Sequence, residues 1–224
     1  MESADYRSIL RRVGSVLIVV GLIDIGALLY CIANKISYSS SLNVFAVIAG
    51  VLIYRGSLRT ASYVCWFSLL MFAAFISVLV IVPFFVPIGL MLAAFRQYPV
   101  QCAVWFAFTA TFLALLYWVK KQLSKNVIRT AMVSGGIKQR SARMAVVIGV
   151  GFATFLGAAT MFTWRSESAQ HAVAMVEARV GPGHRFFVSS MHISETANRS
   201  SVWATVIAWN DTEIKTVPVH WIEP

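Results

Sequence analysis

A short basic loop between two apolar runs constrains this chain more than any other feature. Residues 120–143 read KKQLSKNVIRTAMVSGGIKQRSAR and contain no acidic residue. The flanking runs Val100–Val119 and Met144–Trp164 are each long enough to cross ~30 Å of hydrocarbon. Because Lys and Arg in short loops mark the cytoplasmic side of a membrane, we expect this loop inside the cell. Its basic residues are Lys120, Lys121, Lys125, Arg129, Lys138, Arg140 and Arg143.

The distribution of charge indicates a polytopic α-helical membrane protein and not one large soluble core. Only 12% of the residues are charged and 58% are hydrophobic, whereas soluble domains average roughly 25% charged residues. No Asp or Glu occurs from Ile25 to Ser166, so the net charge of +10 belongs to the membrane part. We interpret this excess as an orientation signal that also attracts anionic lipid headgroups, and we expect the lipid bilayer, not nucleic acid, as the partner of this surface.

Five apolar runs predict about five transmembrane helices in a domain of residues 1–164. The second run is short, and reaches spanning length only if it is counted from Ile36. Pro83 and Pro87 interrupt a charge-free run, because proline removes a helical hydrogen bond. We therefore expect Ile88–Phe95 to form a half-helix, either at the outer interface or re-entrant against the bundle. The expected spans are Val13–Ala33, Leu42–Tyr54, Ser62–Val82, Val100–Val119 and Met144–Thr163.

The loop charges agree with one orientation of these five spans. With the N-terminus inside, the three inner segments carry twelve Lys or Arg residues, and the two outer loops carry only Lys35 and Arg96. Five crossings then place the C-terminus outside. We therefore expect a cytoplasmic N-terminus and an extracytoplasmic C-terminal domain.

Two smaller features belong to the membrane part. Lys120–Val133 is expected to form a basic amphipathic helix that lies on the inner membrane surface and ends at Gly135. Gly149, Ala153 and Gly157 recur at four-residue spacing in the last span. Small residues on one face allow helices to approach closely, so this stripe predicts packing, either within the chain or between two copies.

The remaining residues, 165–224, predict a small α+β domain. Ser166 or Ser168 can cap a helix that stops at Gly181–Gly183. Three β-rich runs follow, with a four-residue hairpin turn between the last two. We expect a helix packed on a three-stranded antiparallel sheet. The expected strands are Arg185–Ile193, Ser201–Trp209 and Ile214–Trp221.

Both faces of the expected middle strand are apolar. Trp203, Thr205, Ile207 and Trp209 alternate with smaller apolar residues. A domain of about 60 residues without a disulfide or metal is marginal in stability. We therefore expect its surplus apolar surface to be covered by the membrane bundle, by a second copy of the chain or by a membrane or periplasmic partner.

Asp24 is the only charged residue expected inside a span. A carboxyl group at this depth usually faces a polar partner or a watery cavity. In the structural interpretation, Asp24 hydrogen-bonds to Asn43, Ser68, Ser77 or Thr109 on a neighbouring helix. In the functional interpretation, it lines a proton or cation pathway.

No motif for catalysis or cofactor binding appears. The three cysteines lie in or beside apolar runs and suit buried apolar positions. None of the four histidines has a metal-ligand spacing, and we find no nucleophile elbow, phosphate loop or dinucleotide fingerprint. We expect no metal and no cofactor, and the sequence leans away from an enzyme.

Residues Arg11–Thr60, RRVGSVLIVVGLIDIGALLYCIANKISYSSSLNVFAVIAGVLIYRGSLRT, resemble uncharacterised bacterial inner-membrane proteins. The resemblance implies a bacterial plasma membrane and brings no activity or site. Two functions follow as hypotheses. The first is a non-enzymatic scaffold, assembly or interaction protein that acts through its periplasmic domain. The alternative is a small proton- or cation-linked transporter or channel that uses Asp24.

Overall fold

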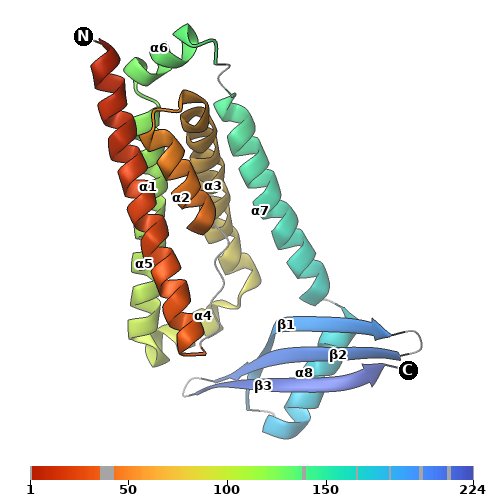
Figure 1. The fold of residues 1–224 in the computed structure, drawn as a ribbon. Coiled ribbons are helices and arrows are strands. Elements are labelled where there is room, and N and C mark those ends of the chain that lie inside the picture. Colours follow the sequence, from red (N-terminus) through yellow and green to blue (C-terminus); the bar gives the residue numbers. More distant parts are fainter. Residues whose placement is uncertain are drawn as a thin grey trace. The chain divides into compact units, whose positions relative to one another are not determined.

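The computed structural model describes residues 2–35, 43–137, 140–164, 166–181, 183–196, 199–210 and 213–223. These residues form helices and one sheet (Figure 1). The helices are α1 (Glu2–Ala33), α2 (Asn43–Tyr54), α3 (Leu58–Phe85), α4 (Ile88–Gln97), α5 (Pro99–Leu123), α6 (Asn126–Ser134), α7 (Ala142–Trp164) and α8 (Glu167–Val180). The strands are β1 (Arg185–Thr196), β2 (Arg199–Trp209) and β3 (Ile214–Glu223). Two compact units divide the chain: residues 1–74 with 111–149, and residues 75–110 with 150–224.

Four of the described helices are long and apolar enough to cross a membrane, where the sequence predicts about five spans. They are α1, α3, α5 and α7. The expected second span, Leu42–Tyr54, corresponds to α2, whose 12 residues cover only about 18 Å. The residues from Ile36 that could lengthen it, 36–42, lie outside the described residues.

Several helix boundaries differ from the expectation. α1 begins at Glu2, so the polar N-terminal segment is helical. α3 begins at Leu58 and runs through Pro83 to Phe85. The Ser57 hydroxyl accepts a hydrogen bond from the Thr60 backbone nitrogen at 3.3 Å, which caps the start of α3. Pro83 cannot donate a backbone hydrogen bond to the preceding turn, and the helix ends at Phe85, three residues beyond the expected end at Val82.

The expected single helix over Lys120–Val133 is wrong. α5 continues to Leu123, and α6 starts separately at Asn126. The apolar side of α6 does not face lipid, since Ile128 and Met132 are buried in a protein core. The amphipathic pattern was real, but its apolar face is covered by helix ends of the same chain.

That core joins one end of several helices in the first unit. Its buried residues come from the first half of α1, the last turn of α2, the start of α3, the end of α5 and α6. They are Leu10, Val13, Ile53, Ala61, Val119, Leu123, Ile128 and Met132. The expected inner segments flank these residues, so within this unit the basic segments gather at one end. We call this the basic end.

Glycines set the closest helix approaches. A Cβ on Gly14 of α1 would lie 2.7 Å from the Gly50 carbonyl oxygen of α2, and a Cβ on Gly50 would lie 2.8 Å from Ile18 Cγ1. Neither residue stood out in the sequence, although glycine within an apolar helix is the signal that could have marked them. These two glycines let α1 and α2 pack backbone to backbone.

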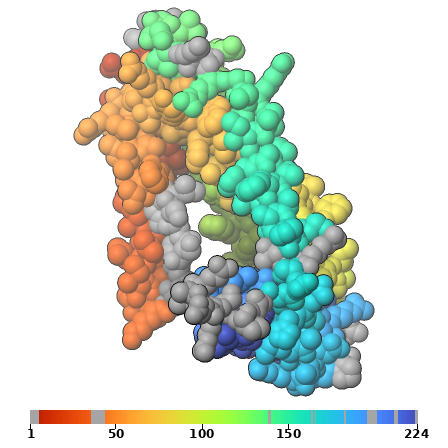
Figure 2. All heavy atoms as spheres, turned by 90° about the vertical axis from the view of Figure 1, so that its right-hand side faces the viewer, coloured from red at the N-terminus to blue at the C-terminus, as the bar shows by residue number. Residues whose placement is uncertain are grey.

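The small-residue stripe of α7 faces α3. A Cβ on Gly149 would lie 2.5 Å from the Leu70 carbonyl oxygen, and one on Gly157 would lie 3.0 Å from the Phe85 ring. Ala153, between them, is buried. Within the chain, this stripe therefore packs against α3. The opposite side of α7 is uncovered along the face seen in Figure 2, with Val147, Phe155 and Phe162 exposed.

The C-terminal helix and sheet form as expected. The Ser166 side chain caps α8 by accepting a hydrogen bond from the Ala169 nitrogen, and Gly181 ends the helix with a φ of 92°. The strands pair antiparallel in the order β1-β2-β3, with a bulge in β1 between Val188 and Ser190. α8 covers one face of this sheet, where Ala169, Ala172, Val176, Val188, Ala204, Val206, Ala208 and Val219 form the core.

Candidate functional site

The sheet has one face under α8 and one opposite face, which we call the open face. Residues paired directly across neighbouring strands lie on the same face. The pairs His192–Trp203 and Trp203–His220 therefore belong to one side, as do Arg185–Trp209 and Trp209–Ile214. The open face consists of Arg185, Phe187, Ser190, His192, Ser194, Ser201, Trp203, Thr205, Ile207, Trp209, Ile214, Thr216, Pro218, His220 and Ile222.

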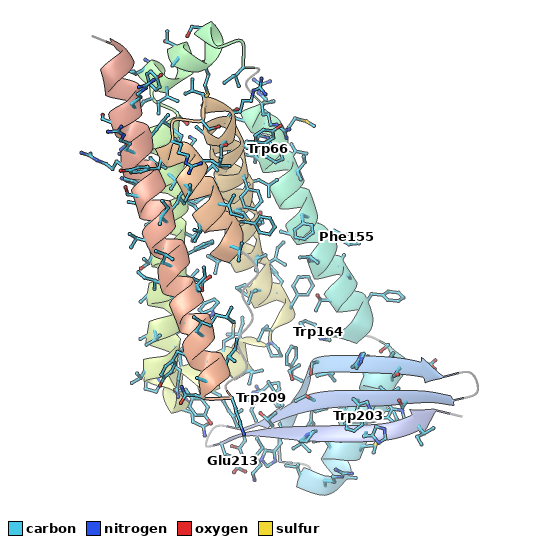
Figure 3. All side chains as sticks on the ribbon, in the orientation of Figure 1. Trp66, Phe155, Trp164, Trp203, Trp209 and Glu213 are labelled. Atoms are coloured by element: carbon cyan, nitrogen blue, oxygen red, sulfur yellow. The ribbon has the colours of Figure 1, made fainter. Side chains whose placement is uncertain are left out.

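Helix α4 covers one end of the open face. A Cβ on Gly89, in the first turn of α4, would lie 3.2 Å from Arg185 Nη1 and 3.5 Å from Trp209 Nε1. Trp209, labelled in Figure 3, is accordingly only 4% exposed. Because Gly89 has no side chain, the Trp209 indole can pack directly against the backbone of α4.

Aromatic rings attach the same face to the ends of two membrane helices. The Trp164 ring, at the end of α7, lies 4.8 Å from the Phe187 ring of β1 in an edge-on arrangement. It also lies 6.1 Å from the Phe85 ring at the end of α3. Edge-to-face pairs at these distances are favourable. Part of the surplus apolar surface of the sheet is therefore covered by the membrane part of the chain.

The far half of the open face is uncovered. Trp203 is 56% exposed and Ile222 is 55% exposed. The Trp203 ring lies against the His220 ring, with centroids 4.1 Å apart, and His192 is its neighbour on the other strand. Figure 3 shows Trp203 on the strand surface away from α8. A Trp exposed between two histidines on a rigid sheet is suited to contact another molecule.

A polar cluster joins the loop before β1 to the β2–β3 hairpin. His184 Nε2 lies 3.0 Å from Glu213 Oε1, and Lys215 Nζ donates to the same oxygen at 2.7 Å. The Asn210 side chain accepts a hydrogen bond from the Glu213 backbone nitrogen at 2.7 Å, which closes the turn. The hydrogen bonds from Lys215 and then His184 lower the pKa of Glu213 below its usual 4.5. This cluster could not be predicted from the sequence, because histidine and glutamate 29 residues apart carry no recognisable spacing.

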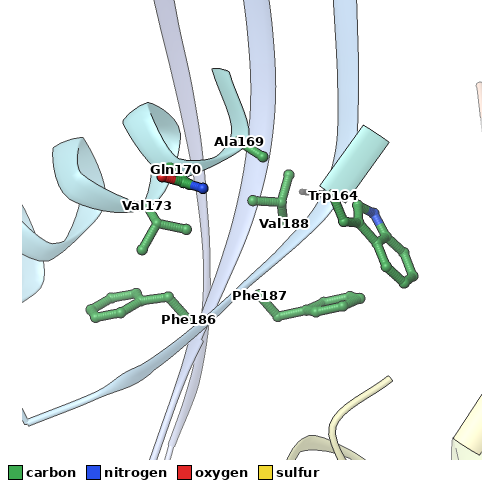
Figure 4. A pocket seen from close by; sticks show the side chains of 7 residues that line it. All are labelled: Trp164, Ala169, Gln170, Val173, Phe186, Phe187 and Val188. Atoms are coloured by element: carbon green, nitrogen blue, oxygen red, sulfur yellow. The ribbon is translucent and has the colours of Figure 1, made fainter. Parts of the chain in front are cut away.

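An apolar hollow of about 290 Å³ lies between the end of α7, the first turns of α8 and β1 (Figure 4). Gln170 is the one polar side chain among the lining residues that the figure labels. Such a lining suits an apolar side chain and offers no acid, base or nucleophile for catalysis. The lining residues are Trp164, Ala169, Gln170, Val173, Phe186, Phe187 and Val188.

The intramembrane polar candidates are placed as follows. Asp24 lies in α1, is half-buried and takes part in an interaction within the protein. Asn43 is the first residue of α2. Of its other expected partners, Ser68 is buried on α3, whereas Thr109 donates to the Trp105 carbonyl of its own helix.

The basic candidates lie in four different settings. Lys120 and Lys121 are in the last turn of α5. Their positive charges interact favourably with the negative end of the helix dipole. Lys125 precedes α6, and Arg129 lies on it. Arg140 and Arg143 lie just before and within the first turn of α7, while Lys138 lies outside the described residues.

The described histidines and cysteines do not converge. No group of three His, Cys, Asp or Glu side chains that could hold a metal occurs among the described residues. His171 instead packs on Trp221, with ring centroids 5.3 Å apart. Cys31, Cys65 and Cys102 are free thiols and half-buried, so they are less buried than the sequence suggested.

Comparison with protein-family models, curated proteins and solved structures finds no match. The resemblance of residues 11–60 to bacterial inner-membrane proteins is therefore not tied to a named family. The class of the protein rests on its helices: four described helices of spanning length and hydropathy make this an integral, multi-pass membrane protein.

Proposed function

We propose that this chain is a non-enzymatic interaction protein of a bacterial inner membrane, and that its C-terminal domain binds another protein through the uncovered half of the open face. The observation that carries the proposal is the exposed Trp203, held between His192 and His220 on the sheet. Trp is among the residues that contribute most to protein interfaces.

The neighbouring half of the same face supports this assignment. At that end the sheet already packs against helix α4, through Trp209 and Gly89. The open face is thus chemically able to bind an apolar helix or strand surface. A small domain whose main core lies on the α8 side also has little apolar surface to spare for solvent. A partner that covers Trp203 and Ile222 would bury the apolar surface that remains exposed on the open face.

The proposal places the C-terminal domain in the periplasm. Its support is the basic end, where the N-terminal helix and the segments around Arg55 and Lys125 come together. Positive segments favour the cytoplasmic side. The functional boundary at residue 165 belongs to the proposal as well, since the compact units are cut at other positions.

Site-specific photocrosslinking in intact cells tests the interaction. A crosslinking amino acid at Ile222, on the open face, is expected to capture a discrete protein, identified by mass spectrometry. The matched control places the same amino acid at Ala178, an exposed position of α8. Trp203→Ala should abolish the Ile222 product. Capture of this chain itself would identify the partner as a second copy. Equal products from both positions, or none from Ile222, would contradict the proposal.

The alternative function, transport through Asp24, lacks a specific supporting observation. Asp24 is half-buried and interacts within its own chain. A structural role for Asp24 requires such an interaction within the chain. A transport role gives no reason to expect it. The two roles are separated by the variant considered in the Discussion.

A further inference from the structure

Arg140 lies against two aromatic rings at the basic end. Its guanidinium lies over the Tyr63 ring, 4.4 Å from the centroid, and 5.4 Å from the centroid of the Trp66 ring. Tyr63 and Trp66 are three residues apart on α3, so they share one side of that helix. Trp66 is labelled in Figure 3, near the start of α3. Two rings from one helix thus hold the charged group of the segment that leads into α7.

This guanidinium has few acidic groups to pair with. In the sequence of its compact unit, residues 1–74 and 111–149, thirteen Lys or Arg residues stand against three acidic ones, Glu2, Asp5 and Asp24. All three acidic residues lie on α1. A guanidinium directs its N–H groups outward in its own plane, where they match two oxygens of a phosphate. The charge therefore calls for an anion from outside the chain.

The surroundings of Arg140 indicate which anion that is. Tyr63 is 54% exposed and Phe67, one turn further along α3, is 41% exposed. α3 is a membrane-span candidate, so an uncovered aromatic side of this helix faces lipid. Tyr63 lies five residues after the helix begins, the level at which aromatic residues meet the headgroup region. Arg59 and Arg143, both exposed, add positive charge nearby in the chain.

We infer that Arg140, Tyr63 and Trp66 form a binding site for one anionic phospholipid. The guanidinium binds the phosphate, and an acyl chain lies along Tyr63. This site differs from a general attraction of basic loops to the membrane, because it requires two neutral rings to orient the charge. It is independent of the function proposed for the C-terminal domain.

Native mass spectrometry of the purified full-length protein tests the inference. Phosphatidylglycerol and phosphatidylcholine with identical acyl chains are titrated in turn. The wild type is expected to bind the first phosphatidylglycerol molecule more tightly than phosphatidylcholine. Arg140→Gln should weaken that binding by about tenfold or more, because a bidentate contact is lost. Lys121→Gln, which removes the same charge elsewhere at the basic end, should weaken it by no more than about fivefold.

A neutral pair of variants separates a built site from diffuse attraction. Tyr63→Leu leaves every charge in place and is expected to weaken phosphatidylglycerol binding several-fold, whereas Phe67→Leu should not. All variants are compared at unchanged thermal stability. Equal effects of Arg140→Gln and Lys121→Gln, or no difference between Tyr63→Leu and Phe67→Leu, would overturn the inference. Displacement of the lipid by millimolar inorganic phosphate would overturn the assignment to a phospholipid.

Discussion

Asp24 is an acidic side chain in the middle of a spanning helix. Such a residue is costly in hydrocarbon unless a polar group or water faces it. It is half-buried and has an interaction within the protein, which agrees with a structural role. The sequence could identify the position from its depth in the span, but it could not identify which neighbour Asp24 contacts.

We expect Asp24→Asn to insert and fold with a melting temperature close to that of the wild type, because an amide can keep a hydrogen bond. Asp24→Leu should lose roughly 1 kcal/mol of stability, the typical size of a hydrogen bond between membrane helices. Thermal unfolding of the detergent-solubilised protein measures both. A proton flux in proteoliposomes that disappears in stable Asp24→Asn would instead establish transport.

Glu213 predicts a pH dependence of the C-terminal hairpin. Hydrogen bonds from Lys215 and His184 lower its folded-state pKa below 4.5. A carboxyl whose pKa is lowered on folding contributes stability above its unfolded pKa, and this contribution is lost as the pH falls through the folded value. We therefore expect the wild type to lose a small amount of stability below about pH 4.5 that Glu213→Gln does not lose. Melting temperatures at pH 3, 5 and 7 measure the difference, and identical profiles would contradict the assignment.

At the scale of elements, glycine contacts decide how the helices pair. The α1–α2 and α3–α7 pairs approach so closely that a single methyl group would meet backbone atoms. Other glycines on the same helices, Gly26 and Gly151, have open space around the corresponding position. Gly26 therefore serves as the matched control for the α1–α2 contact, and Gly151 serves as the control for the α3–α7 contact.

In α1, Gly14→Ala should destabilise the protein by about 1–3 kcal/mol, since the added Cβ would overpack the contact with α2. Gly26→Ala should be neutral or stabilising by up to ~1 kcal/mol, because alanine favours the helix. Thermal unfolding in detergent distinguishes them. Equal melting temperatures for the two variants would show that α1 and α2 do not pack at Gly14.

In α7, Gly149→Ala and Gly151→Ala form the equivalent comparison. The Cβ at residue 149 would lie 2.5 Å from the Leu70 carbonyl oxygen, so we expect a loss of about 1–3 kcal/mol there and little change at residue 151. If neither variant changes the melting temperature of the monomer, and Gly149→Ala instead abolishes a dimer, the stripe packs between copies. Size-exclusion chromatography with light scattering measures the oligomeric state.

At the scale of the whole molecule, the prediction is the orientation. The chain should have residues 120–143 inside and its C-terminus outside. Alkaline phosphatase fused after Pro224 is expected to be active in a bacterial host, and the same enzyme fused within residues 135–141 should be inactive. An inactive C-terminal fusion on an intact, inserted protein would contradict the orientation and, with it, a periplasmic interaction surface.

Much of the fold followed from local patterns, and the exceptions share a cause. The starts of β1 and β3 and the end of β2 were predicted, as was a helix cap at Ser166 or Ser168, because capping groups and alternation act over a few residues. The predicted surface helix at Lys120–Val133 was wrong because an apolar stripe is the same whether lipid or protein covers it. The short second span was predicted from the apolar run Leu42–Tyr54, and α2 forms 12 of these residues.

The sequence by itself determined that this is a membrane protein with spans near residues 13–33, 62–82, 100–119 and 144–163 and a small α+β tail, since hydropathy, charge and alternation are properties of the local chain. Only the tertiary structure decided that Gly14 and Gly50 meet, that α6 covers helix ends, and that Arg140 lies on Tyr63 and Trp66. These contacts depend on the rotation and approach of whole helices. One residue's type does not specify these, because many rotations of an apolar helix have nearly equal hydrophobic energy.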